Sequence, residues 1–169
     1  MEDFRTYRRK LPHWELRGSV YFVTFTCVSG LALPDASKDI VLSSLRFHAG
    51  TKYRLFACVV MATHAHSLLQ PLELPTPPPR GPPPPSLANS GVCYSLAQIT
   101  HSIKSYSANR IRKCLGYTGK VWLDESYDRI VRDDKEFGEK FDYIAANPVK
   151  AGLVEKPEDY RWLFLDDAA

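Results

Sequence analysis

The sequence predicts an α/β (α+β) fold, a ferredoxin-like sandwich in which a mostly antiparallel sheet carries helices on one face, with one helix added near the C-terminus. Its 169 residues fit a single domain over residues 1–169, and 44% hydrophobic and 12% aromatic residues can supply a core. Segments of strand and helix character follow in the order strand, helix, strand, strand, helix, strand, helix. That order is typical of the ferredoxin-like sandwich.

The first half of the chain supplies three strands and one helix. Residues 20–28 are rich in β-branched and aromatic side chains and predict a strand. Residues 39–48 predict a helix whose apolar positions are Ile40, Leu42, Leu45 and Phe47. Residues 54–61 and 64–70 predict two further strands, separated by a short turn around Ala62.

The second half begins with a Pro-rich loop at about residues 71–86. Residues 71–85 hold nine of the 13 prolines, which lack the backbone N–H that a helix or sheet needs. We expect a surface spacer there, and a partner-binding Pro-rich motif is the alternative. A helix is then predicted over 95–115, with an apolar stripe of Leu96, Ile99, Ile103 and Tyr106.

The C-terminal part predicts short strands at 121–123 and 128–132 and a last helix over about 134–146. The apolar stripe of this helix is Phe137, Phe141 and Ile144.

Composition narrows the classes of function. No segment reaches the ~20 apolar residues of a membrane span, and the N-terminus lacks the apolar region of a secretory signal, so we expect a cytoplasmic protein without a membrane partner. The four cysteines are scattered and form no Cys-x-x-Cys pair of a zinc or redox site. We therefore expect reduced thiols.

Basic residues are unevenly distributed, although the net charge is only +3. One group lies near the N-terminus and the other in the second predicted helix; the candidate contacts are Arg8, Arg9, Lys10, Trp14, Lys104, Arg110 and Lys113. Cations that meet phosphates and rings that stack on bases are typical of a nucleic-acid surface. Solvated surface charge is the alternative for either group alone.

Two histidines mark the third predicted strand. His64 and His66 are two positions apart, so on a strand they share one face with Cα atoms about 6.6 Å apart. Two rings placed in this way can hold one metal ion. An isolated His-x-His also occurs as a pair of surface or hydrogen-bonded strand histidines.

Tyr143 lies off the apolar stripe of the last helix and shares a face with Lys140 and Asn147. Its hydroxyl can therefore face a site, with the Asn147 amide one turn later. The alternatives are a tyrosine that only packs its ring, and an asparagine that starts a new turn before Pro148.

With these residues the chain resembles the REP-associated tyrosine transposases, a branch of the single-tyrosine HUH (His, hydrophobic, His) transposase superfamily. The matching segments run in order through nearly the whole chain, at residues 11–14, 21–25, 60–69, 103–108, 119–122, 125–132, 143–154 and 158–162. Two features depart from the family pattern. Ala62 and Thr63 replace the usual Pro-Asn before the first histidine, and the Pro-rich segment after Gln70 is longer than expected.

The resemblance implies a metal-dependent transposase and endonuclease that cleaves and rejoins single-stranded DNA at hairpin-forming repeated palindromes. Tyr143 would attack the phosphate, form a 5′-phosphotyrosine and release a 3′-hydroxyl. His64, His66 and Asn147 would hold Mg²⁺ or Mn²⁺, and the protein would act as a monomer or homodimer. A nucleic-acid-binding module that keeps the fold and metal site without cleavage is the alternative, and an ordinary metal-dependent nuclease is a third.

Overall fold

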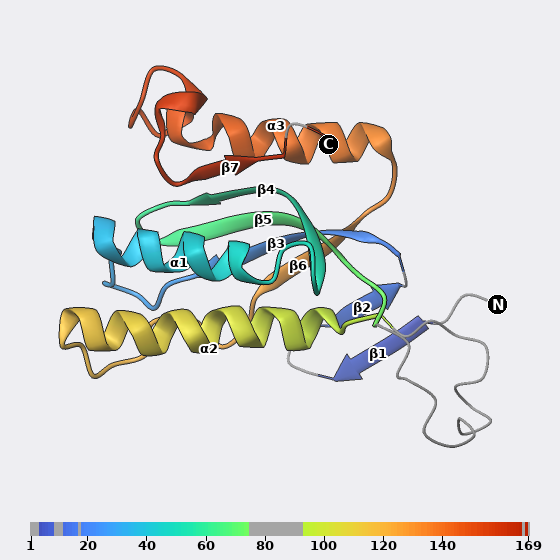
Figure 1. Ribbon diagram of the computed structural model, residues 1–169, viewed down its shortest axis with the longest axis horizontal. Coiled ribbons are helices and arrows are strands. Elements are labelled where there is room, and N and C mark those ends of the chain that lie inside the picture. The colour runs from blue at the N-terminus through green and yellow to red at the C-terminus, as the bar shows by residue number, and fades with distance from the viewer. Residues whose placement is uncertain (1–3, 9–11, 17, 75–92, 167, 169) are drawn as a thin grey trace.

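The computed structural model describes residues 4–8, 12–16, 18–74, 93–166 and 168. Its centre is a five-stranded sheet in the order β6-β3-β5-β4-β7, in which every paired strand is antiparallel to its neighbour (Figure 1). The strands are β3 (Val20–Thr26), β4 (Tyr53–Val60), β5 (His64–Pro71), β6 (Tyr127–Val131) and β7 (Leu163–Leu165). The four strands β6, β3, β5 and β4 have the predicted ferredoxin-like order.

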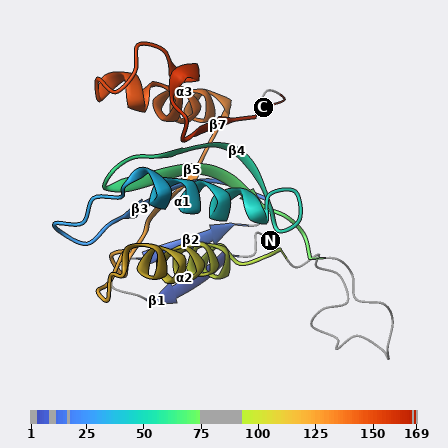
Figure 2. The same ribbon diagram turned by 60° about the vertical axis from the view of Figure 1, so that its left-hand side comes forward.

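Helices cover both faces of this sheet. The helices α1 (Asp35–Phe47) and α2 (Leu96–Leu115) pack together on one face. The helix α3 (Asp134–Lys150) crosses the other face, over β4 and β5 (Figures 1 and 2). The added C-terminal helix is therefore separated from the other two by the sheet. A 3₁₀ turn at Pro157–Asp159 leads from α3 to β7.

Alternation along β3 divides the interior between the two faces. Phe25 packs near Trp122, whose indole nitrogen donates to Ser107 of α2, whereas Phe22 meets Tyr143 of α3. Side chains that alternate along a strand point to opposite faces, so one strand supports two layers of packing. The β3 and β5 strands pair through the full length of this core, with Thr24 opposite His66.

Several details of the sequence prediction were wrong. The last helix does not end at Ala146 but continues for another turn, with Pro148 inside it. Phe47 and Tyr106, predicted as apolar helix positions, are 76% and 56% exposed, and Val41 and Ser107 are buried in their helices instead. Segment 121–123 forms only an isolated bridge, from Trp122 to Cys27.

Three strands were not predicted at all. The strands β1 (Phe4–Arg8) and β2 (Pro12–Leu16) form a separate antiparallel hairpin whose second strand contacts β6. The strand β7 returns after α3 to pair with β4. Along the chain, α3 therefore follows one edge strand of the main sheet, β6, and precedes the other, β7.

The Pro-rich prediction is only partly testable. Pro71 is not in a loop, because it is buried as the last residue of β5 and pairs with Tyr53. Residues 75–86 of the predicted loop lie outside the described residues. The described segments on either side meet at a bridge between Glu73 and Cys93. Among the helices that are described, none has the length and apolar character to cross a membrane.

The thiols behave largely as the sequence predicts. Cys27 and Cys58 are buried and free, Cys93 is half-buried and Cys114 is exposed. Burial raises the pKa of the Cys27 thiol to about 11 and that of Cys58 to about 12. Both therefore stay protonated under ordinary conditions.

Candidate functional site

The histidine strand begins directly after a two-residue turn. Met61 N donates to His64 O across the turn at 2.8 Å. The carbonyls of the two turn residues are also occupied: Ala62 O accepts from Leu33 N at 2.6 Å, and Thr63 O accepts from Cys27 N at 2.8 Å. Satisfied backbone groups hold a turn in one conformation. The unusual Ala62-Thr63 pair therefore forms a well-anchored approach to the histidines.

His64 and His66 lie on one face of β5, as their spacing predicts. Their ring centroids are 4.8 Å apart at an interplanar angle of 65°. The cross-strand partners on β3 are Thr26 opposite His64 and Thr24 opposite His66. Both rings point to the face that α3 covers, because His66 contacts an α3 side chain.

Burial makes both imidazoles neutral. Burial, together with the neighbouring His64 as a smaller second cause, lowers the pKa of His66 to about 4. Burial also lowers the pKa of His64. A neutral imidazole keeps a nitrogen lone pair that can bind a metal ion, whereas a protonated one does not.

Each ring also has a threonine at its Nδ1 atom. Thr24 Oγ1 lies 2.9 Å from His66 Nδ1, and Thr63 Oγ1 lies 3.2 Å from His64 Nδ1. Both distances are within hydrogen-bond range. The second nitrogen of each ring, Nε2, makes no hydrogen bond within the part of the chain that the structure describes.

The N-terminus of α3 is fixed by caps and an ion pair. Asp133 Oδ1 accepts from Glu136 N at 2.7 Å, and Glu136 Oε2 accepts from Arg132 N at 3.0 Å. The first bond is an N-cap by Asp133, and the second bond fixes Arg132, the residue before the N-cap. Arg129 of β6 adds an ion pair to Glu136 at 2.7 Å. The helix is thereby tied to the edge strand from which it departs.

Packing on β4 and β5 then sets the rotation of α3. Ile144 is fully buried, and Phe137 meets Phe56 edge-on at 5.1 Å between ring centroids. With this stripe against the sheet, Tyr143 lies at the border of the helix and is 41% exposed. The predicted stripe is therefore confirmed, and the tyrosine is off its centre.

Tyr143 closes a cluster of three rings. Its ring centroid is 5.3 Å from that of His66 and 5.9 Å from that of Phe22, both in edge-on contact. Phe22 in turn stacks on His66 at 5.3 Å. The fold thus brings together the predicted nucleophile and one predicted metal ligand, from segments far apart in the sequence.

Asn147 follows Tyr143 by one helical turn and is half-buried. Its side chain makes no hydrogen bond to any described residue. No three His, Cys, Asp or Glu side chains in the described ranges group together as a metal site. A divalent ion here would need the amide oxygen of Asn147 beside the two imidazoles. In such a set the amide oxygen is a donor of the kind that Mn²⁺ and Mg²⁺ prefer, whereas the two imidazoles also suit Zn²⁺.

Two lysines of α3 flank the ring cluster, and the sequence reasoning did not propose them as site residues. Lys150 Nζ lies 5.8 Å from the centre of the Tyr143 ring, and Lys140 Nζ lies 5.1 Å from that of Phe22. Neither amine has an ion-pair or hydrogen-bond partner among the residues that the structure describes. Their positions three before and seven after Tyr143, on its helix face, were the available signal.

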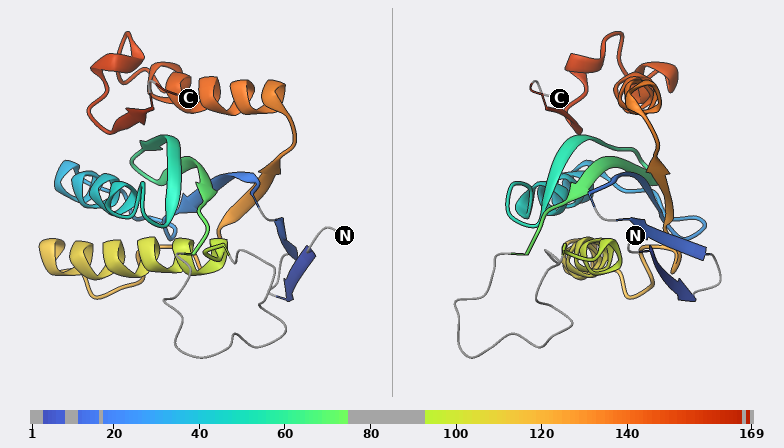
Figure 3. Two further views of the ribbon diagram at one scale, coloured as in Figure 1. Left: turned by 45° about the vertical axis from the view of Figure 1, so that its right-hand side comes forward. Right: turned by 90° about the vertical axis from the view of Figure 1, so that its right-hand side faces the viewer.

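The other candidate DNA contacts are spread over different parts of the chain. Arg8 and Trp14 lie in β1 and β2, whereas Arg9 and Lys10 fall outside the described residues. Arg110 and Lys113 are exposed on α2. Figure 3 shows α2 and α3 on opposite sides of the sheet.

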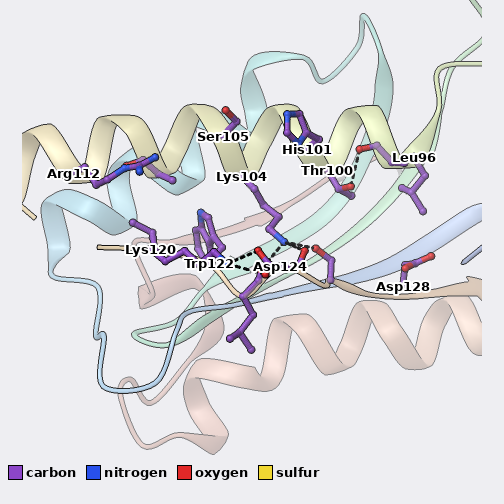
Figure 4. A pocket seen from close by; sticks show the side chains of 15 residues that line it. Leu96, Thr100, His101, Lys104, Ser105, Arg112, Lys120, Trp122, Asp124 and Asp128 are labelled. Carbon is purple, nitrogen blue, oxygen red and sulfur yellow. Dashed lines mark hydrogen bonds and ion pairs between the residues drawn. The ribbon is translucent and has the colours of Figure 1, made fainter. Parts of the chain in front are cut away.

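Lys104 has a structural role. Its Nζ donates to Leu123 O at 2.6 Å and to Asp124 O at 2.8 Å. It lies in a cavity of about 300 Å³ between α2 and the segment 120–128, with His101 and Trp122 among the lining residues (Figure 4). The lysine therefore joins α2 to the segment that leads into β6.

Some known proteins are similar to this chain in sequence or in fold. No protein-family model matches the chain. A Haemophilus influenzae protein assigned to the REP-associated tyrosine transposases is 31% identical over 71 residues. That match covers 41% of this chain and spans only 40% of the length of the relative.

Solved structures extend the comparison to the fold. The structure of a REP-associated tyrosine transposase bound to a REP hairpin aligns with a TM-score of 0.62 at 18% identity. It covers 93% of this chain and 80% of the other. A structure assigned as a Deinococcus radiodurans transposase aligns at 18% identity over 74% of this chain and 87% of the other, with a TM-score of 0.46. The chain is thus similar to REP-associated tyrosine transposases, in sequence over part of its length and in fold over nearly all of it.

Proposed function

We propose that this chain is a metal-dependent tyrosine transposase that cleaves and rejoins single-stranded DNA next to hairpin-forming repeats. The observation that carries the proposal is the edge-on contact of Tyr143 with His66, at 5.3 Å between ring centroids. An exposed tyrosine in contact with one of two adjacent neutral imidazoles suits this chemistry. The similarity to REP-associated tyrosine transposases supports the proposal, as does the hairpin bound to the structure of similar fold.

In the proposed reaction the Tyr143 oxygen attacks a backbone phosphorus. The new bond joins the tyrosine oxygen to phosphorus, and the bond from phosphorus to the 3′-oxygen breaks. The tyrosine proton is lost as the 3′-oxygen leaves, and that oxygen takes up a proton to become a free 3′-hydroxyl. The phosphotyrosine keeps the energy of the phosphodiester, so a 3′-hydroxyl can later attack it and reseal DNA without ATP.

The side chains around Tyr143 have separate tasks. His64, His66 and Asn147 would hold the divalent ion, Mg²⁺ or Mn²⁺, which offsets negative charge on the non-bridging phosphate oxygens when bound. Phe22 and His66 fix the tyrosine ring by edge contacts. Because Tyr143 and Asn147 share one helix, a single helix position sets both the nucleophile and the ligand.

Lys140 and Lys150 would contact the DNA backbone. Their amines have no partner among the described residues and lie on either side of the ring cluster. A lysine is a compact cation that can bind phosphate from several directions. We also propose that the protein is cytoplasmic, as a protein with this activity would need access to cellular DNA.

The decisive experiment is a covalent trapping assay. Labelled single-stranded DNA with a hairpin is incubated with the protein and Mn²⁺, and the adduct is resolved on a denaturing gel. We expect an adduct with the wild type and none with Tyr143→Phe. Tyr106→Phe and Tyr127→Phe are matched controls, because both rings are more than half exposed.

Each other outcome identifies a different function. An adduct that persists in Tyr143→Phe would contradict the nucleophile. Cleaved DNA without adduct would indicate an ordinary metal-dependent nuclease, and tight binding without cleavage would indicate a nucleic-acid-binding module.

We further propose that one chain completes its own site, so that a monomer is active. Tyr143 and His66 of the same chain are in contact, and β7 pairs with β4 beyond the end of α3. Mixing His64→Ala with Tyr143→Phe protein should then restore no cleavage. Restored cleavage would show that two copies share their sites in a homodimer.

A further inference from the structure

Each of the two candidate histidine ligands has a threonine hydroxyl within hydrogen-bond distance of its Nδ1 atom. Thr24 bonds Nδ1 of His66 across the β3 and β5 pair, and Thr63 bonds Nδ1 of His64 from the preceding position in the chain. Neither threonine was predicted as a site residue.

The position of each hydroxyl is fixed by the backbone. Thr24 lies directly opposite His66 in the antiparallel register, so its side chain shares the face of the ring. Thr63 O accepts from Cys27 N at 2.8 Å, which anchors the turn that carries the second hydroxyl. The two bonds therefore arise from two different local structures that reach the same result.

The chemical consequence depends on which ring nitrogen carries the proton. A threonine hydroxyl can accept as well as donate, and a neutral imidazole has one N–H and one lone pair. If Nδ1–H donates to the hydroxyl, the lone pair is at Nε2. Hydrogen bonds from the non-ligating nitrogen are the usual means of fixing tautomer and ring orientation at metal-binding histidines.

We propose that Thr24 and Thr63 are positioning residues that hold His66 and His64 as Nδ1–H tautomers, with both Nε2 lone pairs available to one divalent ion. The proposal rests on the metal site of the proposed function but not on the tyrosine chemistry. It also gives a role to Thr63, which departs from the family pattern. In this protein the hydroxyl of Thr63 orients the first histidine.

The first test reads the tautomer without any metal or DNA. Long-range ¹H–¹⁵N spectra of the whole protein at about pH 8 distinguish Nδ1–H from Nε2–H rings. We expect Nδ1–H for His64 and His66 in the wild type, and a shift of the His66 ring toward Nε2–H in Thr24→Val. An Nε2–H pattern for both rings in the wild type would overturn the proposal.

The second test measures Mn²⁺ affinity by titration calorimetry. Thr24→Val and Thr63→Ala should each weaken Mn²⁺ binding by about 10- to 100-fold, the usual effect of removing such a partner. Thr24→Ser should restore the affinity, because it returns the hydroxyl. Thr26→Val is the matched control. Thr26 lies on β3 with Thr24 and opposite His64, but among the described residues the hydroxyl bonded to the His64 ring is that of Thr63.

The outcomes separate this proposal from the proposed function. Unchanged Mn²⁺ affinity in both hydroxyl variants, equal loss in Thr26→Val, or a wild type that binds no Mn²⁺ would each overturn it. If the hydroxyl variants lose Mn²⁺ while the wild type forms no DNA adduct, the positioning role stands and the transposase proposal fails. Thermal unfolding of every variant checks that lost affinity is not lost fold.

Discussion

Lysines on the two faces of the sheet differ in their surroundings. On the α2 face, Lys104 bonds two backbone carbonyls, Arg112 Nη2 bonds Asn109 Oδ1, and Lys120 pairs with Asp124. On the α3 face, Lys140 and Lys150 lie beside aromatic rings and have no polar partner in the described part of the chain. A basic cluster in a sequence therefore does not show which cations are available to a ligand.

The largest expected effect is on the α3 face. His66→Gln should reduce formation of the DNA adduct by at least about 100-fold, because it removes a proposed metal ligand and the ring that meets Tyr143. His101→Gln is the control, since His101 is exposed on α2. Gel quantification of the adduct at fixed Mn²⁺ gives the comparison. A similar loss in both variants would remove the functional distinction between the faces.

A smaller effect is expected from Lys104→Met, and it concerns stability. The substitution leaves the carbonyls of Leu123 and Asp124 without their charged donor, which costs about 1–3 kcal/mol. Lys113→Met, at an exposed α2 position, should change stability by less than about 0.5 kcal/mol. Urea unfolding measures both. Equal stability of the two variants would mean that the Lys104 hydrogen bonds contribute nothing to the stability of the fold.

The next prediction concerns the unpaired lysines. Lys150→Gln should weaken binding of single-stranded DNA by several-fold and reduce the salt slope by about 0.7, the value for one lost phosphate contact. Its unfolding midpoint should stay near that of the wild type, because the amine has no described polar partner. Lys156→Gln, exposed after the end of α3, is the control. Fluorescence anisotropy at several salt concentrations would detect the difference, and an unchanged slope would contradict a phosphate contact.

The last prediction concerns the rate of thiol labelling, which should differ between the sheet interior and the α2 surface. Cys114 is exposed on α2, whereas burial raises the pKa of Cys27 from its ordinary 9.0 to about 11. At about pH 8, iodoacetamide should label Cys114 quickly and Cys27 only after unfolding. Mass spectrometry of timed samples reads both sites.

The same pKa shift gives the sign of the alkaline response. The folded state favours the protonated Cys27 thiol, so its stabilising contribution is complete below about pH 9 and is lost as the pH rises toward about 11. Unfolding measured over this range should show falling stability, and Cys27→Ala should reduce the slope. A slope that stays the same would exclude Cys27 as its source.

The sequence predicted the main elements well because their signals are local. Strand and helix periods identified the ferredoxin-like order, and the histidine spacing placed His64 and His66 on one face. The end of α3 was missed because Pro148 usually disfavours a helix, whereas here it lies in the final turn, where the missing N–H costs a single hydrogen bond.

Other parts of the candidate site depend on pairing between distant segments. Thr24 meets His66 only through the β3 and β5 register, which no local pattern reveals. The strand β7 has three residues, too short for a clear alternating pattern. Lys140 and Lys150 could have been found by helical spacing from Tyr143, but their lack of polar partners required the structure.

The bridge between Glu73 and Cys93 has a practical consequence for engineering. Tyr94 N also donates to Leu72 O at 3.0 Å, so the chain departs from β5 and returns toward α2 at adjacent points. Because the described fold already brings these two points together, extra residues inserted between them should cost only a modest loop-closure entropy, about 0.6 kcal/mol for each doubling of loop length. We therefore expect the fold to tolerate a fluorescent or affinity tag inserted between Leu74 and Cys93.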